Sequence, residues 1–585
     1  MDDPARIPFL MFDFANSEGE IQSLCFADPI AVIQTNVIDE VRSSLRAVER
    51  ACSDGHYAAG FIAYEAAPAF DPAYSVAPGE RSLPLLWFGL FERPLTEISL
   101  PPLRDYRLTE WTPSVNPGDF DRHIASIKTA IAQGETYQVN YTMRLRAQFD
   151  GDDQAFYRAL AEAQRASYAA YLNLGRWRIL SASPELFFRQ KGSHILTRPM
   201  KGTIRRGRWL EDDVNQANCL LHSAKDRAEN VMIVDLLRND LGRIAETGSV
   251  HVDSLFAIES YPTVWQMTST ITAKARADAT LEDVFAALFP CGSVTGAPKI
   301  NTMNKIAALE DSPRGVYCGA IGYIAPDQTR VFNVAIRTVV LDAYTGVAEY
   351  GVGGGVTWDS TAHEEFKEAL AKAAILTESA PAFDLLETMR LERGVYVLLE
   401  RHLRRLADSA QYFDIRLDLS SVRRQLDDHA RTYCSCARRA RLLVSRDGRI
   451  RVESAALAPL TEAPQSVAVA HRPISRLNRF LYHKTTCRDV YEAAQSDHPD
   501  AFDVLLWNEQ EQITEFTIGN AVFKIRGELL TPDRGSGLLG GTLRQELLEQ
   551  GVIREAVITL SDLRDVTGMW LISSVRGWVP VHVRP

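Results

Sequence analysis

The sequence predicts a protein of the α/β (α+β) class in which two enzyme domains follow one another, residues 1–378 and residues 383–585. Its length of 585 residues is well above the ~100–200 residues of a typical domain. Strand-like and helix-like segments alternate through the first part of the chain, as in α/β proteins. Residues 377–382 are rich in small residues and contain one proline, which is the composition of a linker.

The strands of the first domain are indicated by alternating apolar residues. Residues 178–189 and 194–200 predict two strands around the turn Gln-Lys-Gly-Ser at residues 190–193. Residues 60–65 and 85–89 are further strand-like runs. We assign these runs to the same domain.

Two amphipathic helices are expected, at residues 224–241 and 364–376, because apolar residues recur there with the helical period. The residues expected to face the core are Val231, Val234, Leu237 and Leu241 in the first helix and Phe366, Ala369, Leu370 and Ala373 in the second.

The composition is that of an ordinary globular protein, with 46% hydrophobic and 24% charged residues. A formal net charge of -11 argues against nucleic acid as the main partner, because such binding needs a basic surface. No apolar run reaches the ~18 residues of a membrane-spanning helix, and residues 1–4 lack the pattern of a secretory signal. We therefore expect a cytoplasmic protein that binds neither nucleic acid nor membrane.

Lys201 lies at the end of a predicted strand, in the segment 198–207 with the sequence Arg-Pro-Met-Lys-Gly-Thr-Ile-Arg-Arg-Gly. A lysine held near a proline and next to a glycine is fixed in place and approachable. An amine that is fixed and partly desolvated can have a lowered pKa and act as a nucleophile. For one short motif alone, an exposed lysine at a strand end is the ordinary alternative.

Each of the two predicted helices carries a pair of carboxylates three residues apart, which places both on one helix face. The pairs are Asp226 with Glu229 and Glu365 with Glu368. If the pairs face each other, they form a negative pocket of oxygen ligands, which suits a hard cation such as Mg²⁺. Two solvated acidic faces are the alternative.

Five segments, in order along the chain, resemble the signature blocks of the chorismate-utilising enzymes. They are residues 198–207, 228–243, 292–299, 317–323 and 353–360, the last followed by Glu365 and Glu368. The resemblance implies the large fold of that family, with two sheets packed together and helices outside. Within the family, lysine at position 201 points to aminodeoxychorismate synthases, because anthranilate synthases usually carry alanine there.

The resemblance also implies the roles of individual residues. Glu229 and Glu368 would bind Mg²⁺ directly, and Asp226 and Glu365 would support them. An arginine suits a carboxylate through two parallel hydrogen bonds. The groups implied to bind chorismate are Arg337, Tyr317, Lys372, Gly296 and the backbone around Gly353 and Gly354.

The implied reaction replaces the 4-hydroxyl group of chorismate by an amino group. Lys201 would attack C2 and expel the hydroxyl, and ammonia would then add at C4 and expel the lysine. Glu185 matches the general acid of the family, which protonates the leaving hydroxyl. The predicted hairpin brings Glu185 and Lys201 to the same end of the two strands.

The sequence departs from the family pattern at several positions. Asn230 and Gln266 stand where relatives often have histidine, and Asp226 replaces a usual glutamate. Ala362 and His363 alter the stretch before the second acidic helix. These changes affect details of substrate binding more than the reaction class.

The sequence contains no Gly-x-Cys-x-Gly motif and no catalytic triad of a glutaminase. We therefore expect a separate glutamine amidotransferase subunit, or free ammonium, to supply the nitrogen.

Four segments of the C-terminal part resemble the fold-type IV pyridoxal 5'-phosphate enzymes, whose fold has two subdomains. This group includes branched-chain and D-amino-acid aminotransferases and aminodeoxychorismate lyase. The segments are residues 402–406, 483–488, 513–520 and 539–544.

The resemblance implies that Lys484 holds the aldehyde of pyridoxal 5'-phosphate and that Glu515 keeps its pyridine nitrogen protonated. The groups implied to bind the cofactor phosphate are Arg405, Gly541 and Thr542. Thr388 and Arg488 resemble residues of the lyases. A homodimer formed through this domain is the expected assembly.

Together, the two resemblances indicate a bifunctional 4-aminobenzoate synthase of the folate pathway. The first domain would make 4-amino-4-deoxychorismate, and the second would release 4-aminobenzoate and pyruvate from it. Three alternatives stay open: an anthranilate or isochorismate synthase in the first domain, a branched-chain or D-amino-acid aminotransferase in the second, or a non-catalytic regulatory chain.

Overall fold

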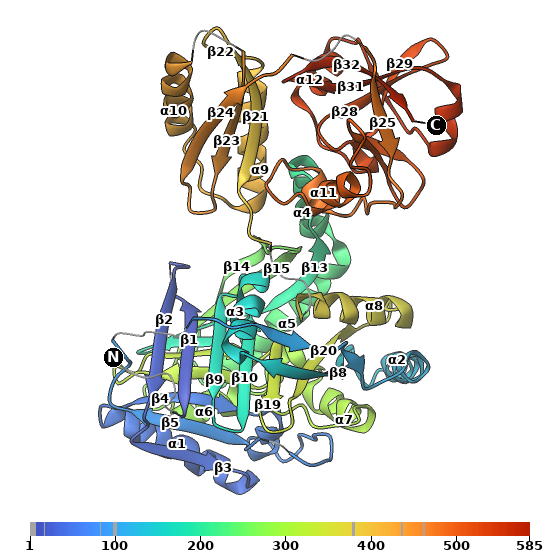
Figure 1. Cartoon of the computed structure of the whole chain (residues 1–585). Coiled ribbons are helices and arrows are strands. Elements are labelled where there is room, and N and C mark those ends of the chain that lie inside the picture. The colour runs from blue at the N-terminus through green and yellow to red at the C-terminus, as the bar shows by residue number, and fades with distance from the viewer. Residues whose placement is uncertain are drawn as a thin grey trace. The chain divides into compact units, whose positions relative to one another are not determined.

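The computed structural model (Figure 1) describes residues 7–16, 18–81, 83–96, 102–376, 381–433, 437–459 and 463–584. Most of the predicted linker, residues 377–382, lies outside the described residues. The chain forms two compact units. The first contains Met1–Arg205 and Ala217–Ala380, and the second contains Arg206–Gln216 and Pro381–Pro585.

The first unit is built on two ten-stranded sheets. One runs in the order β16 (Gly296–Ala297), β8 (Gln138–Gly151), β20 (Val347–Val356), β19 (Thr338–Asp342), β10 (Trp177–Ser183), β9 (Tyr168–Asn173), β1 (Phe9–Ala15) and β2 (Ile21–Ala27), with β6 (Tyr106–Leu108) and β7 (Thr112–Pro113) also paired to β8. The other runs in the order β13 (Met200–Arg205), β15 (Val264–Lys274), β12 (His194–Arg198), β11 (Leu186–Lys191), β18 (Arg330–Val334), β17 (Ala320–Ile324), β4 (Tyr57–Ile62), β5 (Leu86–Phe91) and β3 (Ala31–Thr35), with β14 (His251–Ser260) paired to β15.

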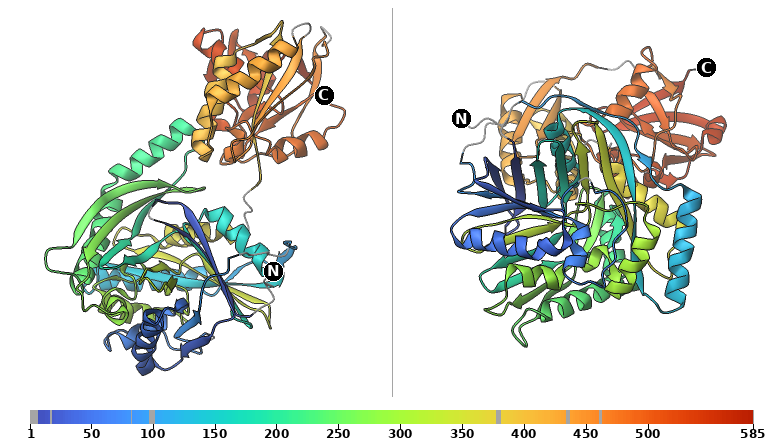
Figure 2. Two further views of the ribbon diagram at one scale, coloured as in Figure 1. Left: turned by 90° about the vertical axis from the view of Figure 1, so that its left-hand side faces the viewer. Right: turned by 90° about the horizontal axis from the view of Figure 1, so that it is seen from below.

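Three clusters of buried residues show how the layers of the first unit pack. One cluster joins the two sheets through side chains such as Phe12 of β1 and Phe61 of β4. A second joins the first sheet to α2 (Pro117–Ala132), α3 (Asp153–Gln164) and α8 (Ala362–Ala373). The third joins the second sheet to α1 (Val41–Ser53), α5 (Ala224–Gly242) and α6 (Leu281–Leu288). The predicted fold of two packed sheets with helices outside is therefore confirmed (Figure 2).

Two further helices lie wholly or partly in the first unit. They are α7 (Lys299–Leu309), next to β8 and β16, and α4 (Leu210–His222), which begins in the second unit and ends in the first.

The predicted hairpin around residues 190–193 is present, because β11 pairs with β12 and Lys191 lies opposite His194. The prediction of one strand over residues 178–189 was wrong. This segment divides at Pro184 and Glu185 into β10 and β11, which belong to different sheets. Pro184 lacks a backbone N–H and cannot continue the hydrogen-bond ladder, so the chain crosses between the sheets there.

The two predicted helices are present as α5 and α8. Six of the eight predicted inward residues are confirmed, because Val234, Leu237, Leu241 and Ala369 are buried and Phe366 and Ala373 pack against the core. The prediction was wrong for Val231, which is 38% exposed, and for Leu370, which is 40% exposed. In α5, polar residues also face inward, where Asn230 accepts a hydrogen bond from Ser269 at 2.6 Å and Asp240 pairs with Lys299 at 2.9 Å. Helical periodicity of apolar residues cannot detect a face that is held by polar partners.

Side-chain caps begin both acidic helices at defined residues. Ser223 accepts a hydrogen bond from the backbone of Asp226, and Thr361 accepts one from the backbone of Glu364. Such caps satisfy the free N–H groups of a first helical turn. The caps thus place Asp226 and Glu365 in the first turns of α5 and α8.

The second unit contains two separate sheets. One has the order β22 (Val395–Tyr396), β21 (Leu385–Glu392), β23 (Arg438–Val444) and β24 (Ile450–Ala456), and packs against α9 (Leu399–Phe413) and α10 (Leu419–Thr432). The other has the order β27 (Ile513–Phe516), β26 (Val504–Trp507), β25 (Gln465–Val469), β32 (Gly577–Val583), β31 (Val566–Ser573), β28 (Asn520–Ile525), β29 (Glu528–Pro532) and β30 (Arg554–Ala556). The helices α11 (Asp489–Ser496) and α12 (Thr542–Glu549) follow β25 and precede β30 respectively. The predicted division into two subdomains corresponds to these two sheets.

Among the described residues, no helix combines the length and the apolar character needed to cross a membrane.

Candidate active sites

A cavity in the first unit gathers residues that are far apart in the sequence. All but one of the site residues predicted for this unit line it. These are Glu185, Lys201, Asp226, Glu229, Tyr317, Arg337, Gly353, Gly354, Glu365, Glu368 and Lys372. The exception, Gly296, lies in β16 opposite Val139 of β8, outside the residues that line the cavity.

Lys201 enters the cavity from β13 and lies against the glycines of β20. A Cβ atom added at Gly355 would lie 2.8 Å from Lys201 Nζ and 2.0 Å from Gln138 Nε2, so a larger residue there would displace these side chains. The side chain of Asn230 donates a hydrogen bond of 3.4 Å to the backbone carbonyl of Lys201. Burial lowers the pKa of Lys201, while the charge of Glu229 acts in the opposite direction. A lowered pKa favours the neutral amine, which is the nucleophilic form.

Glu185 is buried at the crossover between the two sheets, where the sequence predicted a continuous strand. Its Oε1 atom has no hydrogen-bond partner among the described residues. Burial raises the pKa of Glu185 to about 7, and hydrogen bonding from Ser293 and the charge of Lys201 oppose this shift. A carboxyl group with this pKa can donate a proton near neutral pH.

The four predicted carboxylates line the same cavity from α5 and α8. Burial raises the pKa values of Glu229 and Glu365, and neighbouring carboxylates add to both shifts. Glu368 differs because Lys372, at 2.7 Å, lowers its pKa. Carboxylates that raise each other's pKa values mark a place where a cation would be stabilised.

The donor chemistry of this cavity fits Mg²⁺, which binds carboxylate oxygens together with water. The carboxylates do not converge on one point, since the described residues contain no group of three or more metal-ligating side chains placed to hold an ion. Glu365 accepts a hydrogen bond of 2.6 Å from Ser360. An ion would therefore be held by a few of these oxygens and by water.

Basic groups lie at one side of the cavity, next to the glycine-rich end of β20. Lys372 donates a hydrogen bond of 2.9 Å to the carbonyl of Gly353, and a Cβ atom at Gly354 would lie 3.3 Å from Lys372 Nζ. Arg337 donates to the carbonyl of Lys372. Tyr317 is buried, with the Arg144 guanidinium 5.2 Å from the centre of its ring. These groups can receive an anionic ligand.

Several residues of this cavity escaped sequence reasoning. Asn140, Ser293 and Lys225 line it, and Gln138 donates a hydrogen bond of 3.4 Å to Glu229. Ser293 lies within a segment that the resemblance already marked, and Lys225 adjoins Asp226. Gln138 and Asn140 lie in β8, where no motif signals them.

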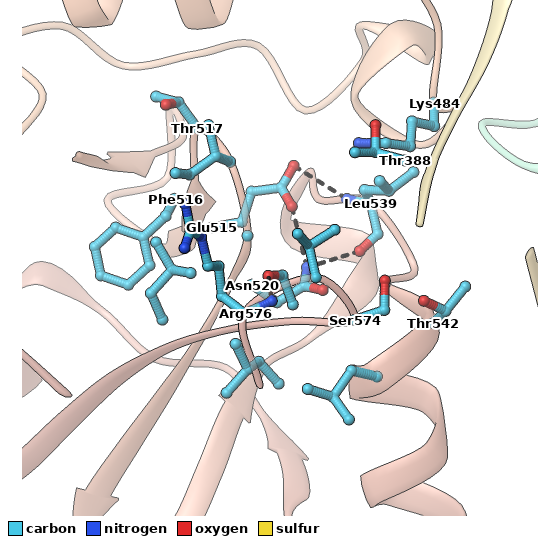
Figure 3. A pocket seen from close by; sticks show the side chains of 18 of the residues that line it. Thr388, Lys484, Glu515, Phe516, Thr517, Asn520, Leu539, Thr542, Ser574 and Arg576 are labelled. Atoms are coloured by element: carbon cyan, nitrogen blue, oxygen red, sulfur yellow. Dashed lines mark hydrogen bonds between the residues drawn. The ribbon is translucent and has the colours of Figure 1, made fainter. Parts of the chain in front are cut away.

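A second cavity lies within the second unit and contains every site residue predicted there. They are Thr388, Arg405, Lys484, Arg488, Glu515, Gly541 and Thr542. Thr388 and Lys484 lie together in Figure 3, because the backbone of β21 bonds to the chain around Lys484, with Leu386 N donating to Lys484 O at 2.9 Å. Burial, together with the positive charges of Arg405 and Arg488, lowers the pKa of Lys484 to about 8.

Glu515 is a buried carboxylate held by three donors. The hydroxyl of Tyr491 donates at 2.8 Å, the amide of Asn520 at 3.0 Å and the backbone N–H of Leu539 at 3.2 Å, and Figure 3 shows the last two bonds. Burial raises the pKa of Glu515 to about 7 against these hydrogen bonds. Tyr491 and Asn520 fix this carboxylate in place, and the sequence contained no signal for the role of Tyr491.

The opposite part of the second cavity has the features of a phosphate site. Gly541 is the N-cap of α12, and no side chain caps this helix start. A Cβ atom at Gly541 would lie 1.8 Å from Asn520 Oδ1, so the turn requires glycine. Arg405 also lines the cavity, and its charge is balanced by Glu387 at 2.6 Å. Free N–H groups at a helix start together with an arginine favour an anion.

Taken together, an amine, a fixed carboxylate and an anion site in one cavity fit pyridoxal 5'-phosphate, with Lys484 for its aldehyde, Glu515 for its pyridine nitrogen and the start of α12 for its phosphate. Three further arginines, which the sequence did not indicate, also line this cavity: Arg439, Arg441 and Arg576. Burial lowers the pKa of Arg576, and the neighbouring positive charges of Arg439 and Arg390 add to this effect.

Two family models match the chain, one after the other. Residues 8–378 match the model described as chorismate binding enzyme. Residues 384–583 match the model described as amino-transferase class IV.

Individual relatives match part of the chain. The chain is 47% identical over 247 residues to an aminodeoxychorismate synthase of Streptomyces griseus, covering 42% of this chain and 34% of that protein. It is 40% identical over 272 residues to aminodeoxychorismate synthase component 1 of Escherichia coli, covering 46% of this chain and 60% of that protein. The match thus spans less than two thirds of either relative.

A solved structure has a similar fold. The crystal structure of anthranilate synthase component I from Streptococcus pneumoniae superposes with a TM-score of 0.53 at 25% sequence identity, covering 65% of this chain and 93% of that chain. Since the chorismate binding enzyme model covers more than half of the chain, and the first unit has the sheets and the cavity described above, the chain belongs to the family of chorismate binding enzymes.

Proposed function

We propose that this chain makes 4-aminobenzoate from chorismate in two steps, one in each unit. The first unit converts chorismate and ammonia into 4-amino-4-deoxychorismate. The second unit, loaded with pyridoxal 5'-phosphate, eliminates pyruvate from that product and leaves 4-aminobenzoate. The observation that carries the proposal is that Lys201 and Glu185 line one cavity together with the four carboxylates of α5 and α8.

The chemistry of the first step follows from this arrangement. The neutral Nζ of Lys201 forms a bond to C2 of chorismate, the two conjugated ring double bonds shift, and the C4–O bond breaks. Glu185 gives the departing hydroxyl a proton, so that water leaves. Ammonia then bonds to C4, the two double bonds shift back, and the C2–N bond to Lys201 breaks. Lys201 leaves as the neutral amine, and the ammonium group formed at C4 gives a proton back to Glu185.

The remaining groups of the first cavity bind and orient the substrate. Chorismate carries two carboxylates, and the cavity offers Arg337 and Lys372 as cationic partners. Mg²⁺, held by Glu229 and Glu368 with support from Asp226 and Glu365, would neutralise the ring carboxylate. Without a cation, the acidic side chains would repel an anionic substrate.

Glu185 provides a pH test of the first step. Its pKa of about 7 keeps it protonated below that pH, so kcat/KM for chorismate should fall as the pH rises through 7. Glu185→Gln removes the acid and should slow the reaction by about 10²–10⁴-fold, the usual contribution of general acid catalysis, and should abolish this fall. The measurement is a pH profile of 4-amino-4-deoxychorismate formation.

The matched control for Glu185 is Glu364→Gln, an exposed carboxylate of α8 that lies outside the cavity. It should keep the wild-type profile. An unchanged pH profile in Glu185→Gln would exclude Glu185 as the general acid.

Glu229 tests the proposed cation. Glu229→Gln should weaken the binding of Mg²⁺ by at least about tenfold, because each 1.4 kcal/mol lost in binding free energy changes the Kd tenfold. Calorimetric titration of the purified protein with Mg²⁺ measures this. Asp235→Asn, on the same helix with its side chain 62% exposed, should leave the Kd unchanged. Equal Kd values for both variants and the wild type would remove Glu229 from the proposed cation site.

In the second unit, pyridoxal 5'-phosphate supplies an electron sink for the bond changes of the elimination. Lys484 would hold the aldehyde of the cofactor, and its lowered pKa would allow its free amine to take up and release protons. Glu515 would keep the pyridine nitrogen protonated, and Thr388, which lies next to Lys484, would orient the reacting groups.

The basic lining of the second cavity favours a lyase over an aminotransferase for apolar amino acids. 4-Amino-4-deoxychorismate carries two carboxylates, whereas a branched-chain amino acid carries one carboxylate and an apolar side chain. Arg439, Arg441 and Arg576 line the cavity in addition to the arginine proposed for the phosphate. Such a surplus of positive charge suits a dianionic substrate.

The ammonia for the first step would come from a glutamine amidotransferase subunit. One relative is named aminodeoxychorismate synthase component 1, which fits an enzyme that works with a second component. Free ammonium at high concentration should replace that partner in vitro.

One experiment tests the whole proposal. Purified protein is incubated with chorismate, Mg²⁺, ammonium and pyridoxal 5'-phosphate, and the products are separated by chromatography. Equal amounts of 4-aminobenzoate and pyruvate are expected. Anthranilate would contradict the role of Lys201, and 4-amino-4-deoxychorismate alone would contradict the lyase.

A further inference from the structure

A short segment that follows the strand of Lys201 is built into the second unit. The strand β13 ends at Arg205 in the first unit, and the next residues, Arg206–Gln216, belong to the second. We call Arg206–Gln216 the arm. Every contact of the arm described below is made within the second unit.

The first contacts of the arm are to the end of α9. Arg206 is nearly buried and forms two hydrogen bonds to Asp213 of the arm, at 2.7 and 2.6 Å. The same guanidinium donates to the carbonyl of Tyr412 at 2.8 Å and lies 4.7 Å from the centre of its ring. The hydroxyl of Tyr412 donates back to the carbonyl of Gly207 at 2.7 Å. A charge-assisted network of this kind holds both partners in one geometry.

The next contacts are to the chain that leads to Lys484. Arg208 donates a hydrogen bond of 2.9 Å to the carbonyl of Gly535. The ring of Trp209 lies 5.3 Å from that of Tyr482, and the Arg534 guanidinium lies 4.7 Å from the centre of the Trp209 ring. Tyr482 thus has the side chain of Trp209 as one of its packing partners.

His483 lies between these contacts and Lys484. Its ring is 4.2 Å from the ring of Tyr412 and 4.8 Å from that of Phe413, and its Nδ1 atom is 3.0 Å from Ser409 Oγ. Burial lowers the pKa of His483 to about 3, so the ring is neutral and acts as a packing group. Tyr412, which is hydrogen-bonded to the arm, therefore packs directly against His483, the residue before Lys484.

The arm is also linked to Glu515, through a buried cluster. Trp209 packs against a buried cluster that contains Leu481, Tyr482 and Tyr491. Tyr491 donates the hydrogen bond of 2.8 Å to Glu515. The same tryptophan therefore supports the positions of both Lys484 and Glu515.

From these contacts we infer that residues Arg206–Trp209 of the arm are positioning residues of the second site, acting through Tyr412, Tyr482 and Tyr491 on Lys484 and Glu515. This inference rests on the proposed function of the second unit. It means that a segment lying between two parts of the chorismate-binding unit in the sequence is needed for the geometry of the cofactor site.

The test uses the full chain and measures the cofactor directly. Pyridoxal 5'-phosphate bound to a lysine absorbs visible light, and this absorbance changes when the nitrogen that joins them loses its proton. Trp209→Ala and Arg208→Ala should each raise the Kd of pyridoxal 5'-phosphate by about tenfold. The pH midpoint of the absorbance should move up by about half a unit, because a looser site admits water, which favours the protonated form.

Three variants separate positioning from simple loss of stability. Trp209→Phe keeps an aromatic ring and should restore most of the wild-type Kd and midpoint. Trp578→Ala and Arg431→Ala, in the same unit and outside the cavity and the arm, should leave the midpoint unchanged even if the melting temperature falls.

Wild-type values of the Kd and the midpoint in Trp209→Ala and Arg208→Ala would overturn the inference. A lower melting temperature with an unchanged midpoint in these variants would overturn it as well. If the wild-type protein itself gives no absorbance with pyridoxal 5'-phosphate, the proposed function of the second unit fails, and the inference fails with it.

Discussion

Lys201→Ala should reduce the formation of 4-amino-4-deoxychorismate from chorismate and ammonium by at least about a hundredfold, since a loss of 2.7 kcal/mol in transition-state stabilisation has this effect. The variant removes the amine that is proposed to bond to C2 and that lies against Gly355. The same variant should still convert supplied 4-amino-4-deoxychorismate into 4-aminobenzoate at the wild-type rate. Chromatography of both reactions measures the two effects in one preparation.

The control for Lys201 is Lys225→Ala. Lys225 is a lysine of α5 that lines the same cavity, so its removal takes away an amine of this cavity but leaves the proposed nucleophile in place. Its effect should be much smaller than that of Lys201→Ala. Equal losses in the two variants would contradict a specific role of Lys201 as the nucleophile, and loss of both reactions in Lys201→Ala would contradict two independent sites.

Lys484→Ala should stop the second step and let 4-amino-4-deoxychorismate accumulate, with the first step unchanged. The visible absorbance of bound pyridoxal 5'-phosphate should disappear, because the variant has no amine for the aldehyde. We expect 4-aminobenzoate to fall by at least about a thousandfold, which corresponds to ~4 kcal/mol of transition-state stabilisation. Absorbance spectra and product chromatography measure the two effects.

Lys524→Ala is the matched control, because Lys524 is an exposed lysine of β28 outside the second cavity. It should keep both the absorbance and the output of 4-aminobenzoate. If Lys484→Ala still produced 4-aminobenzoate at the wild-type rate, the role of Lys484 would be wrong.

Much of the local structure was predictable from the sequence because it depends on neighbouring residues. The positions of α5 and α8 follow from helical periodicity and from the capping side chains of Ser223 and Thr361. The hairpin of β11 and β12 follows from the alternation of apolar and polar residues on both sides of a turn that contains glycine. Lys201 was recognisable from a short motif with a proline and a glycine near the amine, whereas Lys484 was indicated by the resemblance of residues 483–488.

Other features depend on contacts between distant parts of the chain, and only the tertiary structure decided them. Pro184 and Glu185 lie in a segment that reads as one strand, and it is the pairing of β10 and β11 with different sheets that turns this point into a buried crossover. Burial there raises the pKa of Glu185 to about 7. A pKa set by desolvation cannot be obtained from the identity of the residue alone.

The sequence by itself indicated the class of the protein, its two tandem resemblances and a set of site residues, all of which except Gly296 line the two cavities. The tertiary structure decided which polar groups hold those side chains: Asn230 on the backbone of Lys201, Tyr491 and Asn520 on Glu515, and the arm Arg206–Gln216 within the second unit. The physical reason is that a short motif contains the residues that contact a ligand. The residues that hold those side chains in place do so through packing and hydrogen bonds between distant parts of the sequence, and such contacts leave no periodic pattern.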